Sequence, residues 1–140
     1  MRIKLGFITA MDVLPLDYRR SLMSFFKYCL EQSDPEQFGD FYDKGTCRSK
    51  SYSFAVAFPK GTTFQKDQVI LAKHGFSLTF STGDLSDVIL FFNSFMQQKG
   101  KAFLLPNGNK MVLKYINYVH VPTIMTDEII VRMLSPLVLR

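Results

Sequence analysis

The stretch that decides the fold runs from Gly75 to Gly100 and reads GFSLTFSTGDLSDVILFFNSFMQQKG. Its first part places Phe76, Leu78 and Phe80 at every second position, with Ser and Thr between them. Alternation of this kind is typical of a strand with one buried face. The second part changes to helical spacing, so the stretch predicts a strand that leads directly into a helix.

The helix is expected over residues 84–99. Asp84 is a candidate N-cap, and Asp87 can reach back to it in a variant of the capping box. Gly100 is expected to end the helix. We expect one apolar stripe to face the core, consisting of Leu85, Val88, Ile89, Phe92, Phe95 and Met96.

Upstream, residues 2–9 alternate apolar and polar side chains and predict another half-buried strand. A first helix is expected over residues 17–32, with Asp17 as its N-cap. Asp34-Pro35 predicts where this helix ends, because the residue before proline disfavours helical geometry. Its buried side is expected to consist of Tyr18, Leu22, Phe25, Phe26, Cys29 and Leu30.

The middle of the chain contains two further predicted features. Residues 34–50 form a long polar segment, which we interpret as a loop that is either functional or mobile. Residues 51–58 alternate again and predict a strand. Residues 68–72 and 76–81 are predicted to be the arms of a hairpin, with the turn at 73–75.

Downstream, we expect a strand at 102–105, a long strand from about 110 to 121 after a turn, and a last strand at 128–134. Two helices that each bury one side must share one face of the sheet. The sequence therefore predicts an α+β fold, a ferredoxin-like βαββαβ sandwich with an extra β-hairpin and both helices on one face of an antiparallel sheet.

The composition fits one intracellular domain. The chain has 140 residues, fourteen Phe and a net charge of +5, which favours an acidic partner such as nucleic acid. Two cysteines, Cys29 and Cys47, form no disulfide framework, and we expect a cytoplasmic location. No signal peptide or stretch long enough to span a membrane is expected.

No catalytic or cofactor motif is recognisable, so we expect no cofactor and no metal. The two histidines, His74 and His120, have no cysteine or carboxylate at metal-ligand spacing. The GFSLTF segment partly resembles the aromatic strand of an RNA-recognition sheet. We nevertheless expect Phe76 and Phe80 in the core, because any half-buried strand needs such residues.

Basic residues gather in the first helix and in the segment after it. They are Arg19, Arg20 and Lys27 in the helix, and Lys44, Arg48 and Lys50 in the segment. Such a cluster attracts a phosphate backbone, and Tyr28 and Tyr42 could stack on bases. The alternative is a solvated helix face beside a mobile loop.

Four passages, in this order, resemble the N-terminal half of the CRISPR-associated endoribonucleases called Cas-six, of the RAMP superfamily. They are LPLDYRRSLMSFFKYCL (14–30), KSYSFAVAF (50–58), VILAKHGFSLTFSTGDLSDVILFF (69–92), and KMVLKYINYVHVP (110–122) with IIVRMLSPLVLR (129–140). The resemblance implies a single RAMP N-terminal domain over residues 1–140 and a second, similar domain beyond Arg140.

The resemblance also implies an activity. Such proteins cleave precursor CRISPR RNA within its repeats without metal, by attack of a 2′-hydroxyl that leaves a 2′,3′-cyclic phosphate. CRISPR repeat RNA is the implied partner; other CRISPR-associated proteins and a second copy of the chain are further candidates. Residues 1–140 alone are not expected to cleave efficiently, since half of the RNA clamp would be missing.

The resemblance suggests roles for individual residues. Lys50 matches a lysine that would stabilise the transition-state phosphate, and Tyr42 or Tyr28 would position the 2′-hydroxyl or donate to the leaving group. Arg19, Arg20, Lys27, Lys44 and Arg48 would hold the RNA backbone.

Two departures from the family pattern leave other functions open. The loop after the first helix has Tyr42 where the family usually has a histidine, and the family's Gly-rich loop has no counterpart. One alternative is a non-catalytic RNA-binding scaffold of the same superfamily. Another is a ferredoxin-like module that pairs through its sheet and binds no nucleic acid.

Overall fold

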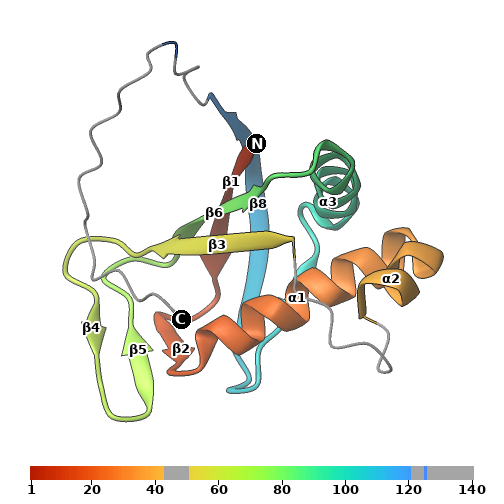
Figure 1. The fold of residues 1–140 in the computed structure, drawn as a ribbon. Helices are drawn as coiled ribbons and strands as arrows, with labels where there is room; N and C mark the ends of the chain where they lie inside the picture. Colours follow the sequence, from red (N-terminus) through yellow and green to blue (C-terminus); the bar gives the residue numbers. More distant parts are fainter. Residues whose placement is uncertain (43–50, 121–124, 126–140) are drawn as a thin grey trace, which may run out of the picture.

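A five-stranded antiparallel sheet forms the centre of the molecule. The computed structural model describes residues 1–42, 51–120 and 125. The strands lie in the order β3-β6-β1-β8-β7 (Figure 1). Their bounds are β1 (Arg2–Thr9), β3 (Tyr52–Ala57), β6 (Phe76–Thr82), β7 (Ala102–Leu104) and β8 (Lys110–Val119).

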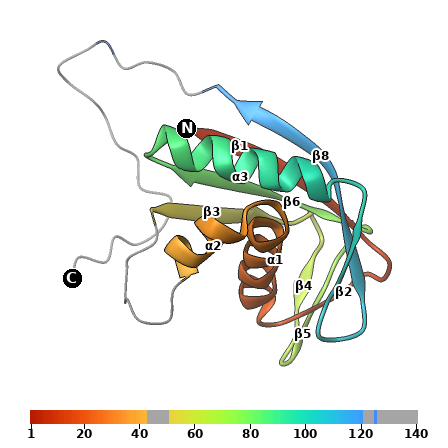
Figure 2. The same ribbon diagram turned by 90° about the vertical axis from the view of Figure 1, so that its right-hand side faces the viewer.

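Two long helices cover one face of this sheet, α1 (Tyr18–Ser33) and α3 (Leu85–Gln98) (Figure 2). They pack against each other, and the hydroxyls of Ser33 and Ser94 share a hydrogen bond between them. The order β1-α1-β3-β6-α3-β8 is the ferredoxin-like βαββαβ arrangement, which confirms the predicted fold class. None of the helices in the described residues is long and apolar enough to cross a membrane.

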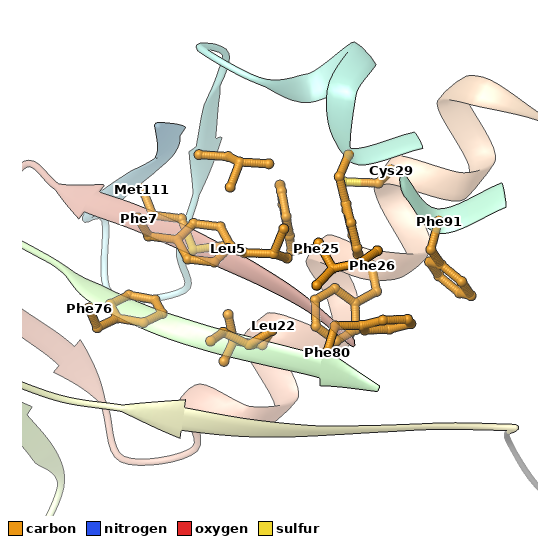
Figure 3. Close-up of a cluster of buried hydrophobic side chains, with 14 of the residues drawn as sticks. Leu5, Phe7, Leu22, Phe25, Phe26, Cys29, Phe76, Phe80, Phe91 and Met111 are labelled. Atoms are coloured by element: carbon orange, nitrogen blue, oxygen red, sulfur yellow. The ribbon is translucent and has the colours of Figure 1, made fainter. Parts of the chain in front are cut away.

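Aromatic side chains fill the space between helices and sheet (Figure 3). Phe80 on β6 is fully buried, and its ring centroid lies 4.9 Å from that of Phe91 and 5.6 Å from that of Phe26. The predicted buried face of α1 is confirmed from Leu22 to Leu30. Phe76 and Phe80 belong to the core as expected, so neither forms a stacking platform for bases on the open sheet face.

The predicted hairpin between 68–72 and 76–81 is wrong. A second sheet has the order β2-β5-β4, with β2 (Val13–Pro15), β4 (Thr63–Phe64) and β5 (Gln68–Ile70). The extra hairpin is therefore β4–β5, while β6 pairs with β1 and β3. Backbone pairing explains the difference, because the amide of Leu71 donates to the carbonyl of Asp12 at 2.7 Å, which directs this segment away from β6.

Gly75 lets the chain enter β6 close to β1. A Cβ atom at Gly75 would lie 2.4 Å from the carbonyl oxygen of Phe7, and φ is +156°. We expect Gly75→Ala to lower the free energy of unfolding by about 2 kcal/mol, because backbone cannot yield as a flexible side chain can. Urea unfolding measures this, with Gly83→Ala as control, since nothing lies within 4 Å of a Cβ there. Equal stability of both variants would contradict the prediction.

The predicted loop at 34–50 is wrong in its first half. A short helix, α2 (Pro35–Tyr42), follows α1 directly, and residues 43–50 lie outside the described residues. Asp34 caps it, since its Oδ1 accepts a hydrogen bond from the amide of Gln37 at 3.0 Å. Proline is favoured at the first position of a helix, so Asp34-Pro35 can begin α2 as well as end α1. Phe41 then anchors α2 on Phe91, with ring centroids 5.5 Å apart.

The predicted buried stripe of α3 is right at only two of its six positions. Val88 and Phe95 are buried as expected, but Phe91 is buried too. Four members of the predicted stripe are exposed instead: Leu85, Ile89, Phe92 and Met96. The helix carries two apolar faces, and aromatic partners on β3, β6 and α2 select the one containing Phe91.

The helix caps agree with the sequence only in part. Asp84 caps α3 by accepting a hydrogen bond from the amide of Ser86 at 2.8 Å, and Gly100 ends the helix with φ of +81°. Asp87 does not form the expected capping box and instead accepts a hydrogen bond from Ser51. Asp17 occupies the N-cap of α1 without a side-chain cap hydrogen bond. The predicted strand at 128–134 lies outside the described residues.

Candidate nucleic-acid interface

Two cations of α1 lie on aromatic rings at the β3 side of the molecule. The guanidinium carbon of Arg19 is 4.7 Å from the ring centroid of Phe54, and Nζ of Lys27 is 5.0 Å from that of Tyr42. Ring faces attract cations and hold them in place without neutralising their charge. Both cations therefore remain available to an anionic partner along this side of α1.

Two tyrosine hydroxyls form a pair between α2 and β3. The hydroxyls of Tyr42 and Tyr52 are 2.8 Å apart, and the Tyr52 hydroxyl also donates to the sulfur of Met23 at 3.7 Å. Burial raises the pKa of Tyr42, and its hydrogen bond to Tyr52 raises it further. Burial likewise raises the pKa of Tyr52. Both phenols stay protonated at neutral pH, so they can donate a proton or a hydrogen bond but cannot act as a general base.

This pair predicts a change of stability with pH. The raised pKa keeps the proton on Tyr42 in the folded chain above pH 10, where the unfolded chain loses it. This contribution to stability is therefore complete below pH 10 and declines as pH rises further. Tyr42→Phe should cost about 1 kcal/mol at pH 7 through the lost hydrogen bond, and this gap should narrow above pH 10. Denaturant unfolding of both proteins at pH 7 to 11 measures the difference between their free energies of unfolding. A difference that stays constant over this range would contradict the prediction.

A small hollow adjoins the tyrosine pair at the end of β3 and β6. Its volume is about 290 Å³. It is lined by Ser51, Tyr52, Ser53, Ser81, Thr82 and Gly83. Nearby, the N-terminal ammonium of Met1 donates to the carbonyl of Thr82 at 2.7 Å. Hydroxyls beside a positive charge suit a phosphate or ribose group.

Tyr28 and Arg20 lie on the other side of α1. The ring of Tyr28 is 5.6 Å from that of Phe103 on β7. Arg20 lines a groove of about 600 Å³ together with Asp17, Ser21, Ser24, Phe103, Leu104, Leu105, Pro106 and Gly108. Because β3 and β7 are opposite edges of the main sheet, the structure separates Tyr28 from Tyr42. The two tyrosines therefore do not belong to one site.

The open face of the sheet is a surface that the sequence analysis missed. Small residues cover β3 and β6 there: Ser53, Ala55, Ala57, Ser77, Thr79 and Ser81. Arg2 and Lys4 project from β1 on the same face. Tyr115 lies over Gly6, where a Cβ would come within 2.0 Å of the ring. The Ser and Thr positions of GFSLTFST were the signal for this flat, polar and basic platform.

The remaining candidates are placed as follows. His74 is exposed in the β5–β6 connection, and its Nδ1 lies 2.8 Å from Oδ1 of Asp12. His120 is exposed directly after β8. Lys44, Arg48 and Lys50 lie outside the described residues. Among the residues that are described, no group of three His, Cys, Asp or Glu side chains could hold a metal ion.

The fold and these two surfaces define a ferredoxin-like α+β domain, with cations on its first helix and on the opposite, open face of its sheet. No protein-family model and no curated protein sequence matches the chain. Solved structures do match, although sequence identity is low in every case.

Three of these structures show the range of the similarity. A RAMP protein described as binding different RNA substrates has a TM-score of 0.70, 14% identity, 89% of this chain covered and 50% of its own. The product of a Cas6-related gene from Pyrococcus furiosus has a TM-score of 0.70, 13% identity and 89% and 49% coverage. The product complex of a Cas6 protein has a TM-score of 0.60, 18% identity and 82% and 39% coverage.

The chain has the fold of the RAMP and Cas6 structures. The resemblance found in the sequence is thereby confirmed at the level of the fold. The chain spans about half the length of the solved structures it matches.

Proposed function

We propose that this chain is half of a CRISPR RNA-processing protein and binds repeat RNA. The observation that carries the proposal is the match of nearly the whole described fold to RAMP and Cas6 structures. The cations of α1 and of the open sheet face supply the charge that a phosphate backbone requires. A second ferredoxin-like domain would complete the protein, in keeping with the half-length coverage of the matched structures.

The proposed reaction is metal-independent cleavage within the repeat. A 2′-hydroxyl would attack the adjacent phosphate, its proton would leave with a base, and the 5′-oxygen would depart after taking up a proton. The products would be a 2′,3′-cyclic phosphate and a free 5′-hydroxyl. Such a reaction requires a cation at the developing charge, and Lys50 is our candidate for this role.

The positions of the two candidate tyrosines, Tyr42 and Tyr28, favour different roles for them. Tyr42 lies beside the cation Lys27 and hydrogen-bonds to Tyr52, which lines the hydroxyl-lined hollow. Burial raises the pKa of Tyr42 and keeps the phenol protonated, so it can donate a hydrogen bond to the leaving oxygen. Tyr28, at the opposite edge of the sheet, fits an RNA-contacting role better than a catalytic one. The general base remains unassigned within the described residues.

This last point favours one alternative, a non-catalytic RNA-binding scaffold. His74 is paired with Asp12 at the far end of the molecule from the tyrosine pair, and Tyr42 is unsuited to accept a proton at neutral pH. Incubating the complete protein with labelled repeat RNA in EDTA distinguishes an endoribonuclease from a non-catalytic scaffold. Cleavage to cyclic phosphate ends supports the enzyme, and tight binding without cleavage supports the scaffold.

RNA binding itself makes a prediction about salt. Each phosphate contact through Arg or Lys releases counterions, so affinity should fall steeply as salt rises. We expect Arg19→Ala or Arg20→Ala in the complete protein to weaken binding and to reduce the log–log salt slope by about one. Lys66→Ala, in the β4–β5 turn, is the matched control and should change neither quantity. Affinity that does not depend on salt would instead support a protein-interaction module.

A further inference from the structure

The groove of about 600 Å³ between the N-terminal half of α1 and the β7–β8 hairpin, which we call the α1–β7 groove, carries one carboxylate and one guanidinium. Asp17 and Arg20 both line it, yet neither forms an ion pair with the other or with any other residue that the structure describes. Asp17 is the N-cap residue of α1, but its side chain accepts no cap hydrogen bond. Both charges therefore remain available to a ligand.

The hairpin wall of the groove is apolar and held in place by Asn109. This residue is fully buried, and its side-chain oxygen accepts hydrogen bonds from the amides of Met11 and Lys110. Its side-chain nitrogen donates to the carbonyls of Met11 and Val13. The turn is thereby fixed to the segment between β1 and β2, so the wall is formed before any ligand binds. It consists of Phe103, Leu104, Leu105 and Pro106. A fixed apolar wall suits the face of a flat aromatic ligand.

The helix wall includes a polar group that the protein leaves unsatisfied. Ser21 lines the groove and is only 5% exposed, and its hydroxyl has no hydrogen-bond partner among the described residues. The hydroxyl of Ser24, by contrast, donates to the carbonyl of Arg20 at 3.1 Å. Buried hydroxyls are nearly always hydrogen-bonded, so the unpartnered Ser21 indicates a polar ligand in the groove.

We propose that the α1–β7 groove binds one unpaired guanosine nucleotide of the RNA, an inference that rests on the proposed function. The carboxylate of Asp17 accepts hydrogen bonds from the N1–H and 2-amino groups of guanine. The guanidinium of Arg20 binds the phosphate of the same nucleotide, and the base lies against the apolar hairpin wall.

The carboxylate of Asp17 is what selects guanine. An ionised carboxylate can only accept hydrogen bonds, and its two oxygens fit two neighbouring donors. Guanine alone among the four bases presents two adjacent N–H donors on its pairing edge. Adenine and cytosine place a ring-nitrogen acceptor beside their amino group, and uracil places a carbonyl oxygen on each side of its N3–H. These acceptors would repel the carboxylate, as would a phosphate.

The groove lies far from the tyrosine pair of Tyr42 and Tyr52. The strand order places β7 and β3 at opposite edges of the main sheet, and four strand spacings of ~4.8 Å separate them by about 19 Å. The guanosine in the groove is therefore a different nucleotide from one bound at the tyrosine pair. The groove selects RNA by sequence, and its loss should change affinity rather than the cleavage rate of saturated protein.

Binding of the complete protein to short labelled oligouridylates with one variable central base, followed by fluorescence anisotropy, tests the proposal. The wild-type protein should bind the guanine form about 10-fold more tightly than the adenine, cytosine or all-uracil form, the effect of one good bidentate base contact. Inosine lacks the 2-amino group and should lose part of this preference. A central 1-methylguanine lacks the N1 proton and should lose all of it.

Asp17→Asn should change the preferred base. Asn caps a helix as well as Asp does, so the circular dichroism spectrum and melting temperature should stay as in the wild type. The Asn amide donates as well as accepts, which suits xanthine, whose 2-oxo group replaces the amino group of guanine. The variant should therefore prefer xanthine to guanine, whereas the wild type should reject xanthine. Asp84→Asn, the same change at the N-cap of α3, is the matched control and should keep the preference for guanine.

The possible failures are distinguishable. A wild-type protein that binds all the oligonucleotides equally would overturn this inference and leave RNA binding intact, whereas binding to none of them, nor to repeat RNA, would overturn the proposed function as well. An Asp17→Asn protein that still prefers guanine would place base recognition outside the groove. An equal loss of affinity for every base in this variant would give Asp17 a structural role only and would likewise overturn the inference.

Discussion

Replacing Lys50 with alanine in the complete protein is expected to slow single-turnover cleavage of repeat RNA by ~100-fold or more, the usual effect of losing one preorganised charge-stabilising donor. If Lys50 faces the scissile phosphate, its contact strengthens as negative charge builds in the transition state. Ground-state affinity should change far less, because the other cations remain.

The measurement pairs a cleavage rate with an equilibrium binding constant for the same RNA. Lys60→Ala, at an exposed lysine between β3 and β4, is the matched control and should leave both unchanged. A rate and an affinity that fall by the same factor would make Lys50 a backbone clamp only. No change in either would mean that Lys50 does not correspond to the catalytic lysine, and the scaffold function would then be favoured.

Replacing Phe80 with alanine is expected to have the largest effect on stability, about 3–5 kcal/mol. The ring of Phe80 stacks on that of Tyr52 at 5.1 Å and meets Phe26, Phe91 and Phe95 within 5.6 Å. It therefore joins β3, both long helices and the centre of the sheet. Removing it leaves a cavity that these rigid neighbours cannot fill.

Urea unfolding of the 140-residue chain measures this loss. Phe80→Leu keeps most of the volume and should cost only about 1–1.5 kcal/mol. Phe64→Ala removes the same side chain where it is 59% exposed, and it should cost much less than Phe80→Ala. Similar losses at positions 64 and 80 would contradict the central place of Phe80 in the core.

The elements that the sequence predicted well have strong local signals. The buried face of α1 repeats at helical spacing over four turns, and Ile3, Leu5 and Phe7 are buried at every second position of β1. The sequence did not predict α2, because Asp34-Pro35 can mark the end of one helix or the start of another, and local sequence does not distinguish the two. The β5–β6 hairpin was wrong because Gly75 resembled a turn residue, while its actual role is a close approach to Phe7.

The candidate site was predicted less well than the fold. The sequence located Arg19, Lys27 and Tyr42 but could not reveal that Tyr42 pairs with Tyr52. It also grouped Tyr28 with Tyr42, whereas the sheet order places them at opposite edges. Residues that belong to different elements come together only when the order of strands is known, and no local pattern encodes that order.

By itself, the sequence determined the types of the main elements, their order and the βαββαβ class. These depend on the periods of helix and strand, on caps such as Asp84 and on stops such as Gly100, all of which act within a few residues. Only the tertiary structure decided which of two apolar faces α3 buries. That choice depends on contacts of Phe91 with Phe41, Tyr52 and Phe80, which lie far apart in the chain, and it leaves Ile89 and its neighbours exposed to solvent.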